Sequence, residues 1–115
     1  MKTTEITIKA GTSFELPLML SKKGTVVHWV FHTKGYDIRF GIAKGRPGAD
    51  REFLVANTSY APDSPQQGKV TLPDTGDYFL VWDNSYSRIR EKHVLYSVEI
   101  VLPELTVMEK VECAR

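Results

Sequence analysis

The fold is decided by residues 76–83, which read Gly76-Asp77-Tyr78-Phe79-Leu80-Val81-Trp82-Asp83. Every second residue from Tyr78 to Trp82 is large and apolar, and a β-strand points every second side chain to the same face. The stretch begins at a glycine and ends at an aspartate, two residue types that favour turns. It therefore predicts a strand that buries one face and is bounded by a turn at each end.

The same period of two recurs along the chain, and helical periodicity is almost absent. Segments rich in Gly, Pro, Asp and Ser separate the alternating segments. We expect strands at residues 5–9, 13–20, 25–32, 36–42, 51–57, 67–72, 77–83 and 93–102. About eight short strands spaced by polar turns predict an all-β fold, an antiparallel two-sheet β-sandwich with a jelly-roll-like arrangement.

The alternation also identifies a core. Tyr36 is expected on the inward face of its strand, and the inward stripe of the last strand is expected to reach Leu102. The buried set comprises Trp29, Phe31, Ile38, Phe40, Tyr78, Leu80, Trp82 and Tyr96.

Length and charge limit the organisation and the partners. The chain has 115 residues, enough for one hydrophobic core, and we expect a sandwich over residues 1–103 and an unassigned tail over 104–115. Its net charge of +1 gives no global field that would attract nucleic acid. No stretch reaches the ~20 apolar residues of a membrane span, the start lacks a signal-peptide pattern, and the single Cys113 favours a reducing compartment. A cytoplasmic location is expected.

No set of residues assembles a catalytic, metal or cofactor site. His28 and His32 lie on one strand face roughly 13 Å apart, which is too far to share an ion. His93 stands alone at a strand start, and Cys113 lies in a charged terminal segment. No glycine-rich loop leads into a helix, as a phosphate-binding loop would. The sequence therefore predicts a protein that is not an enzyme and that uses no metal or cofactor.

Two features bear on the type of sandwich. The run from Asp74 to Tyr78 resembles the tyrosine corner of immunoglobulin sandwiches, in which the tyrosine hydroxyl bonds the backbone of the corner. An immunoglobulin-like fold is therefore the alternative sandwich, although Leu80 and Pro17 stand where its cysteines are expected. Pro17 also predicts an edge strand or a bulge, because proline cannot donate to a central ladder.

Two segments resemble a known domain. The first combines Val27-His28-Trp29-Val30-Phe31 with Tyr36-Asp37-Ile38-Arg39-Phe40-Gly41-Ile42, and the second continues from Gly76-Asp77-Tyr78 through Asp83-Asn84-Ser85-Tyr86-Ser87 to the strand that begins near Lys92. Over about residues 5–103 the chain resembles the GOLD domain of Golgi and lipid-traffic proteins. It is most similar to the GOLD domains of CRAL-TRIO-type lipid-transfer proteins and of the Golgi acyl-CoA-binding-domain protein. The resemblance implies a β-sandwich that docks other proteins.

The turn after the deciding strand has a structural explanation. Asp83 and Asn84 carry short polar side chains that can bond nearby backbone groups, and asparagine tolerates left-handed backbone. We expect these two residues and Tyr86 to fix the hairpin.

The segment after this turn, residues 88–92, is different. It places three cations around one isoleucine in a loop, where folding gives no reason for them. It is either a solvated loop or a contact patch for an acidic protein segment or an anionic lipid surface, helped by Lys44, Arg46 and Arg51. The candidate partner-binding residues are Arg88, Ile89, Arg90 and Lys92.

The main functional hypothesis is a non-catalytic adaptor in Golgi, membrane or lipid traffic. It would dock other proteins, or a neighbouring lipid-binding domain, through sheet edges and loops, peripherally on Golgi or endosomal membranes. One alternative is direct binding of an anionic membrane surface through the basic loop. A second alternative is an immunoglobulin-like or carbohydrate-binding sandwich, and the inward positions expected for Trp29 and Trp82 count against sugar stacking.

Overall fold

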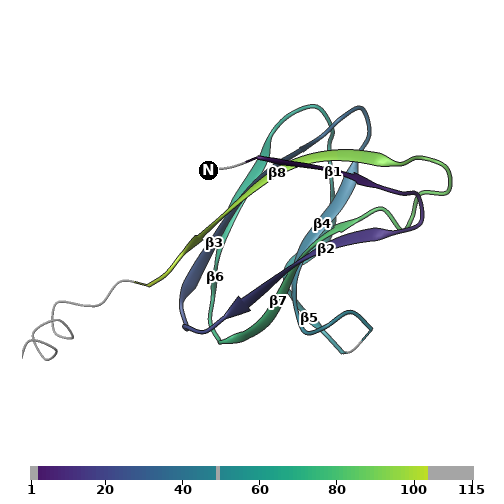
Figure 1. Ribbon diagram of the computed structural model, residues 1–115. Coiled ribbons are helices and arrows are strands. Elements are labelled where there is room, and N and C mark those ends of the chain that lie inside the picture. The colour runs from purple at the N-terminus through teal and green to yellow at the C-terminus, as the bar shows by residue number, and fades with distance from the viewer. Residues whose placement is uncertain (1–2, 49, 104–115) are drawn as a thin grey trace, which may run out of the picture.

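The computed structural model describes residues 3–48 and 50–103 and consists of eight strands in two sheets (Figure 1). All eight expected strands are present, so the prediction of an all-β sandwich is confirmed. The strands are β1 (Thr4–Ile8), β2 (Ser13–Leu20), β3 (Thr25–Thr33), β4 (Ile38–Lys44), β5 (Glu52–Tyr60), β6 (Gln66–Leu72), β7 (Gly76–Asp83) and β8 (Lys92–Val101).

The strand order is that of a jelly roll. One four-stranded sheet has the order β1-β8-β3-β6 and the other has the order β2-β7-β4-β5, and every pairing is antiparallel. The first strand thus pairs with the last, and β2 pairs with β7, as two interleaved Greek keys require. An immunoglobulin sandwich does not pair its strands in this order, so the immunoglobulin-like alternative for the fold is wrong.

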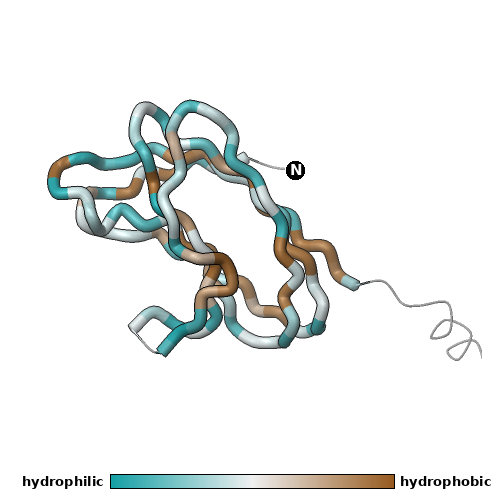
Figure 2. Tube along the Cα trace, turned by 180° about the vertical axis from the view of Figure 1, so that it is seen from behind, coloured by the Kyte–Doolittle hydropathy of each residue, from teal (hydrophilic) through white to brown (hydrophobic). Residues whose placement is uncertain are grey.

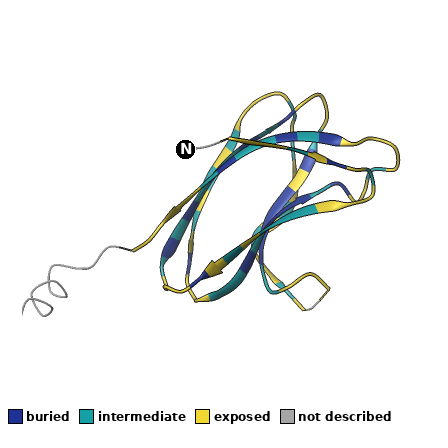
Figure 3. Ribbon diagram, viewed as in Figure 1, coloured by how far each residue is buried: buried dark blue, intermediate teal, exposed yellow. Residues whose placement is uncertain are grey.

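The core lies between the two sheets and follows the alternation in the sequence. In β3 the residues alternate between buried and partly buried along the whole strand, as Figure 3 shows in dark blue and teal. Trp82 of β7 lies at the centre, with its ring 5.0 Å from Phe40 and 4.7 Å from Tyr96. Seven of the eight expected core residues are buried, and Tyr96 is partly buried against them.

Three expected core positions are wrong, and one of them is Ile100 in the inward stripe of β8, which is 38% exposed. Tyr36 is 43% exposed, because β4 begins only at Ile38. The turn before it is longer than expected, since Gly35 has a φ of 78° and its N–H donates to the Asp63 carboxylate. Leu102 is exposed because it lies beyond Val101, the last paired residue of β8.

The tyrosine corner forms even though the fold is not an immunoglobulin sandwich. The Tyr78 hydroxyl donates to the Asp74 carbonyl oxygen at 2.9 Å, and the Tyr78 ring is fully buried. The corner therefore anchors the start of β7 in the core, which is the role that the sequence predicts for it.

Pro17 lies in an edge strand, as predicted. The register of β2 with β7 is continuous, and Pro17 lies opposite Phe79. Proline has no N–H to donate to β7. Pro17 therefore occupies a position whose backbone groups point away from β7, and the free edge of β2 lacks a hydrogen-bond donor at that position. This edge is poorly suited to pairing with a further strand.

The edge strand β6 passes under the indole ring of Trp29. A Cβ atom added to Gly68 would lie 2.5 Å from Cζ2 of that ring, so only glycine lets the strand approach so closely. We expect Gly68→Ala to lower the free energy of unfolding by about 1–3 kcal/mol, because the ring must shift in a packed core. Lys69→Ala on the same strand is the control, since Lys69 is exposed. Chemical denaturation measures both, and equal stabilities would contradict the close approach.

Candidate docking site at the β7–β8 loop

The loop between β7 and β8 is the most exposed feature at one end of the sandwich. Ile89 is 85% exposed, and its neighbours Arg88 and Arg90 are exposed as well. Figure 2 shows a hydrophobic segment at the end of this loop between hydrophilic ones, and Figure 3 shows the loop in yellow. The structure therefore brings together three of the four candidate partner-binding residues.

The arginines of this end have no carboxylate partners. Within residues 3–48 and 50–103, Arg46 is paired with Asp77 and Arg51 with Glu15. The other arginines of the described ranges have no carboxylate of those ranges within 4 Å, and they are Arg39, Arg88 and Arg90.

The expected helpers of the loop lie elsewhere. Strand β4 starts at the end that carries the loop and finishes at Lys44, which interacts with Asp74 at 3.9 Å. Arg46 follows it at that far end, and Arg51 forms a bidentate pair with Glu15 on the outer face of its sheet. The expectation that these three cations assist the loop is wrong.

Two of the unpaired arginines lie over tyrosine rings. The Arg90 guanidinium lies 4.5 Å from the centre of the Tyr36 ring, and that of Arg39 lies 5.3 Å from the Tyr86 ring. The Tyr86 hydroxyl donates to the Asp37 carbonyl oxygen at 3.1 Å, which ties the β7–β8 loop to the β3–β4 loop. We call the resulting surface the tip patch. It consists of Tyr36, Arg39, Tyr86, Arg88, Ile89 and Arg90.

A fully buried asparagine holds the tip patch in place. The side-chain amide of Asn84 donates to the carbonyl oxygens of Ile8, Lys9 and Arg90 at 2.8–3.3 Å. It thus connects the β1–β2 turn with both ends of the β7–β8 loop. These contacts agree with the structural role expected for Asn84.

Lys92 is not part of the exposed loop, so its assignment to the contact site is wrong. It is 2% exposed, and its ammonium donates to Oδ1 of Asn84 at 2.8 Å and to the Tyr86 hydroxyl at 3.0 Å. Burial lowers the pKa of Lys92, although the Asp37 carboxylate at 3.9 Å opposes the shift. The sequence could have indicated this burial, because Lys92 lies two residues before Val94 in β8 and therefore on the same inward face of the strand.

Asp83 also stabilises the turn, through its side-chain carboxylate. Its carboxylate accepts hydrogen bonds from the Ser13 hydroxyl, the Asn57 amide and the Ser85 N–H at 2.8–3.0 Å. Burial alone would raise the pKa of Asp83, but these hydrogen bonds outweigh it and hold the pKa below its usual value. These contacts agree with the structural role expected for Asp83.

Tyr86 makes the tip sensitive to alkaline pH. Burial, followed by the nearby Asp37 carboxylate, raises the pKa of Tyr86 from 10.0 to about 12. Between these values the unfolded chain loses the phenol proton while the folded chain keeps it, so stability falls as pH rises. We expect the free energy of unfolding to fall more steeply from pH 10 to pH 12 in the parent than in Tyr86→Phe.

Chemical denaturation at stepped pH measures this slope. Tyr36→Phe is the matched control, because Tyr36 lies in the same patch and its hydroxyl makes no hydrogen bond to other described residues. The slope of Tyr86→Phe should be shallower than that of this control. If Tyr86→Phe keeps the parent slope, the proton linkage assigned to Tyr86 is wrong.

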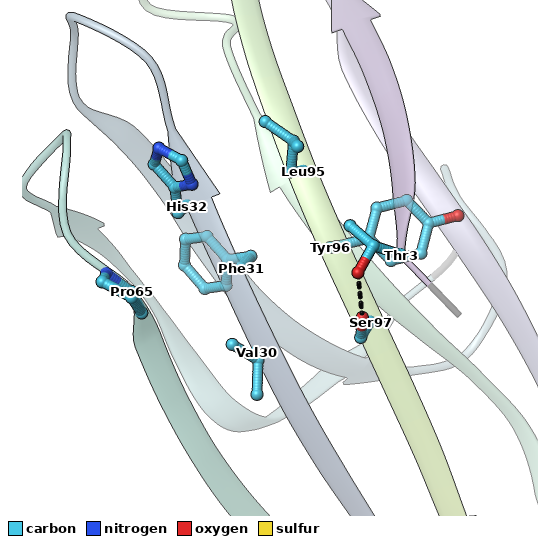
Figure 4. A pocket seen from close by; sticks show the side chains of 8 residues that line it. All are labelled: Thr3, Val30, Phe31, His32, Pro65, Leu95, Tyr96 and Ser97. Atoms are coloured by element: carbon cyan, nitrogen blue, oxygen red, sulfur yellow. Dashed lines mark hydrogen bonds between the residues drawn. The ribbon is translucent and has the colours of Figure 1, made fainter. Parts of the chain in front are cut away.

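A second candidate surface is the outer face of the β1-β8-β3-β6 sheet. A hollow of about 190 Å³ lies there beside His32 and Leu95, and the hydroxyls of Thr3 and Ser97 are hydrogen-bonded at 3.1 Å. Figure 4 shows the side chains that line this hollow and the bond between Thr3 and Ser97. A second hollow of about 380 Å³ lies beside His28 and Lys69. Both are open to solvent.

In the part of the chain that the structure describes, no group of three His, Cys, Asp or Glu side chains is placed to hold a metal ion. Over the same part, no helix is long and apolar enough to cross a membrane. Cys113 and the expected tail lie outside the described residues.

Comparison with curated proteins gives partial likenesses. No protein-family model matches the chain. The human FYVE and coiled-coil domain-containing protein 1 is 25% identical over 104 residues, which cover 86% of this chain and 7% of that protein. Protein ctg-1 of Caenorhabditis elegans is 27% identical over 100 residues, which cover 82% of this chain and 26% of that protein. The chain thus spans only a small part of the relatives that it matches.

Comparison with solved structures gives a likeness of fold. The structure described as "CBM4 structure and function" superposes with a TM-score of 0.54 at 11% identity, covering 85% of this chain and 83% of that one. The N-terminal cellulose-binding domain of β-1,4-glucanase C from Cellulomonas fimi gives 0.52 at 14% identity, covering 91% and 82%. The chain therefore has the fold of these β-sandwiches.

Proposed function

We propose that the chain is a non-catalytic docking module that binds a partner protein through the tip patch. The observation that carries this proposal is that Arg39, Arg88 and Arg90, all without carboxylate partners among the described residues, lie at the end of the sandwich that carries the exposed Ile89. The fold itself does not need these side chains, because Asn84 and Lys92 hold the turn from beneath.

The arrangement suits protein recognition for two reasons. An apolar side chain at the centre of a contact supplies anchoring energy, and unpaired arginines around it supply orientation and a faster encounter with an acidic partner. The loop is also tied down, so little ordering is needed on binding. In a longer protein such a module would act as an adaptor, and the resemblance to the GOLD domain supports a role in Golgi, membrane or lipid traffic at the cytoplasmic side.

A pull-down with matched variants tests the proposal. The tip variant combines Arg88→Glu, Ile89→Asp and Arg90→Glu. The control variant combines Lys22→Glu, Met19→Asp and Lys23→Glu, which makes the same change of charge and hydropathy at exposed residues of the far end. Proteins captured by the parent and by the control should be lost from the tip variant. Equal capture by all three would contradict docking through the tip patch.

Anionic vesicles decide whether the same loop binds lipid directly. A membrane that attracts a nearby Lys or Arg by ~1 kcal/mol would hold the patch only weakly and only at low salt. If vesicles with anionic lipid bind the parent, and neither neutral vesicles nor any protein does, the lipid alternative replaces protein docking.

Carbohydrate binding is the second candidate function. The likeness of fold to the cellulose-binding domain favours it, and the two hollows on the β1-β8-β3-β6 sheet would be its site. Trp29 and Trp82, the side chains best suited to stack on sugars, are buried. Calorimetric titration with cello-oligosaccharides separates the two functions. Binding that is abolished by His32→Ala and retained by the tip variant would favour the sugar-binding function.

A further inference from the structure

Arg39 and Arg90 of the tip patch have their charge available for a ligand. The carboxylates at this end of the sandwich have other partners: Asp37 accepts a hydrogen bond from the Ser59 hydroxyl at 3.0 Å, and Glu91 interacts with His93 at 3.2 Å. Asp83, which lies opposite Arg39 in the register of β4 with β7, accepts three hydrogen bonds from other residues. Arg39 and Arg90 have no such partner among the described residues.

The tyrosine rings also bear on how these arginines are held. A guanidinium positioned over an aromatic ring is attracted by that ring, and its side chain is partly ordered before a ligand arrives. The Cζ atom of Arg90 lies 4.5 Å from the centre of the Tyr36 ring and that of Arg39 lies 5.3 Å from the centre of the Tyr86 ring, and the hydrogen bond from Tyr86 to the Asp37 backbone joins the loops that carry the rings. A planar guanidinium edge matches a carboxylate with two parallel hydrogen bonds.

We infer that the tip patch recognises an acidic protein segment with closely spaced carboxylates beside an aliphatic residue. Arg39 and Arg90 bind the carboxylates, and Ile89 contacts the aliphatic side chain. Tyr36 and Tyr86 act as positioning residues that order the guanidiniums. The inference rests on the proposed docking function and specifies its partner.

A compact acidic segment fits the charges better than an extended anionic surface. The side chains of Asp37 and Glu91 are about half exposed and lie at the same end of the sandwich as the arginines. A broad negative surface would bring its own charges against these two carboxylates. A short segment can place its carboxylates on the arginines alone, and it therefore avoids this repulsion.

The test uses two labelled peptides on the intact chain. One carries two pairs of glutamates around a single leucine, and the other replaces every glutamate by glutamine. Fluorescence anisotropy is measured at about 0.01 M and about 0.15 M salt, where the screening length falls from about 30 Å to about 8 Å. We expect the glutamate peptide to bind at least about tenfold more tightly than the glutamine peptide at low salt, which is the effect of one charge-assisted hydrogen bond.

Variants separate bidentate recognition from charge alone. Arg39→Lys and Arg90→Lys keep the charge and lose the planar edge, and each should weaken binding of the glutamate peptide by about tenfold. Arg46→Lys is the control, because Arg46 lies at the far end and the variant makes the same exchange of arginine for lysine. Thermal melting confirms that each variant is folded. Binding that is unchanged in Arg39→Lys and Arg90→Lys, or equally weakened in the control, would overturn the inference.

The outcomes also distinguish this inference from the docking function. If the tip variant loses its captured proteins while the parent binds both peptides equally, the docking function stands and the acidic partner is wrong. If anionic vesicles or inorganic phosphate bind the parent and the glutamate peptide does not, the partner class is likewise wrong. If neither the captured proteins nor the peptides respond to the tip variant, both proposals fail.

Discussion

Replacement of Trp82 by alanine is expected to lower the free energy of unfolding by about 3–5 kcal/mol. The Trp82 side chain is fully buried, and its ring contacts the rings of Phe14, Phe40 and Tyr96 with centroids 4.7–6.1 Å apart. Alanine would leave a cavity between the two sheets that the surrounding strands can close only in part. Chemical denaturation measures the loss.

Two further variants help to explain the loss of stability in Trp82→Ala. The indole N–H of Trp82 has no hydrogen-bond partner among the described residues, so Trp82→Phe removes an unsatisfied donor and should cost less than Trp82→Ala. Met19→Ala, at a residue that is 84% exposed, should stay within about 0.5 kcal/mol of the parent. A Trp82→Ala variant as stable as the parent would contradict the assignment of the core.

Removal of Asn84 should have an effect of similar size for a different reason. Asn84→Ala deletes the acceptor that lies 2.8 Å from the Lys92 ammonium and the donors to three backbone carbonyls. A buried charge that loses its partner costs about 3–5 kcal/mol, and we expect a loss in this range. Denaturation followed by circular dichroism gives the value.

A double-mutant cycle assigns the cause of this loss. Lys92→Met removes the charge and keeps an apolar side chain of similar length, so it should cost much less than Asn84→Ala. Once Lys92 is methionine, Asn84→Ala no longer leaves a charge without a partner, and the two losses should not add. Strict additivity would show that the ammonium and the amide are not coupled.

The core was predictable because its signal is local. The alternation in residues 76–83 places Tyr78, Leu80 and Trp82 on one face whatever the other strands do, and all three are fully buried. The tyrosine corner is local as well, since its two bonded partners, Asp74 and Tyr78, are four positions apart in the sequence. Strand order was predictable only as a class, because pairings such as β1 with β8 join residues that are far apart in the sequence.

The tip patch was predictable only in part. Arg88, Ile89 and Arg90 stand out because the loop has no need of them, whereas Tyr36 and Arg39 join the patch only through the packing of the β3–β4 loop against the β7–β8 loop. In the sequence, Lys92 follows Arg88 and Arg90 closely and is therefore predicted to be a third cation of the loop. In the fold its ammonium turns inward to Asn84, which is a contact between a strand start and a buried turn.

The most direct measurement of the central claim is site-specific photo-crosslinking. A photoreactive amino acid replaces Ile89 in one variant and Met19 in another, two side chains that are 85% and 84% exposed at different ends of the sandwich. The variants are irradiated in cytosol, and their products are compared by mass. Docking through the tip patch predicts a discrete protein adduct at position 89 that is absent at position 19. Adducts at position 19 alone, or the same adducts at both positions, would contradict it.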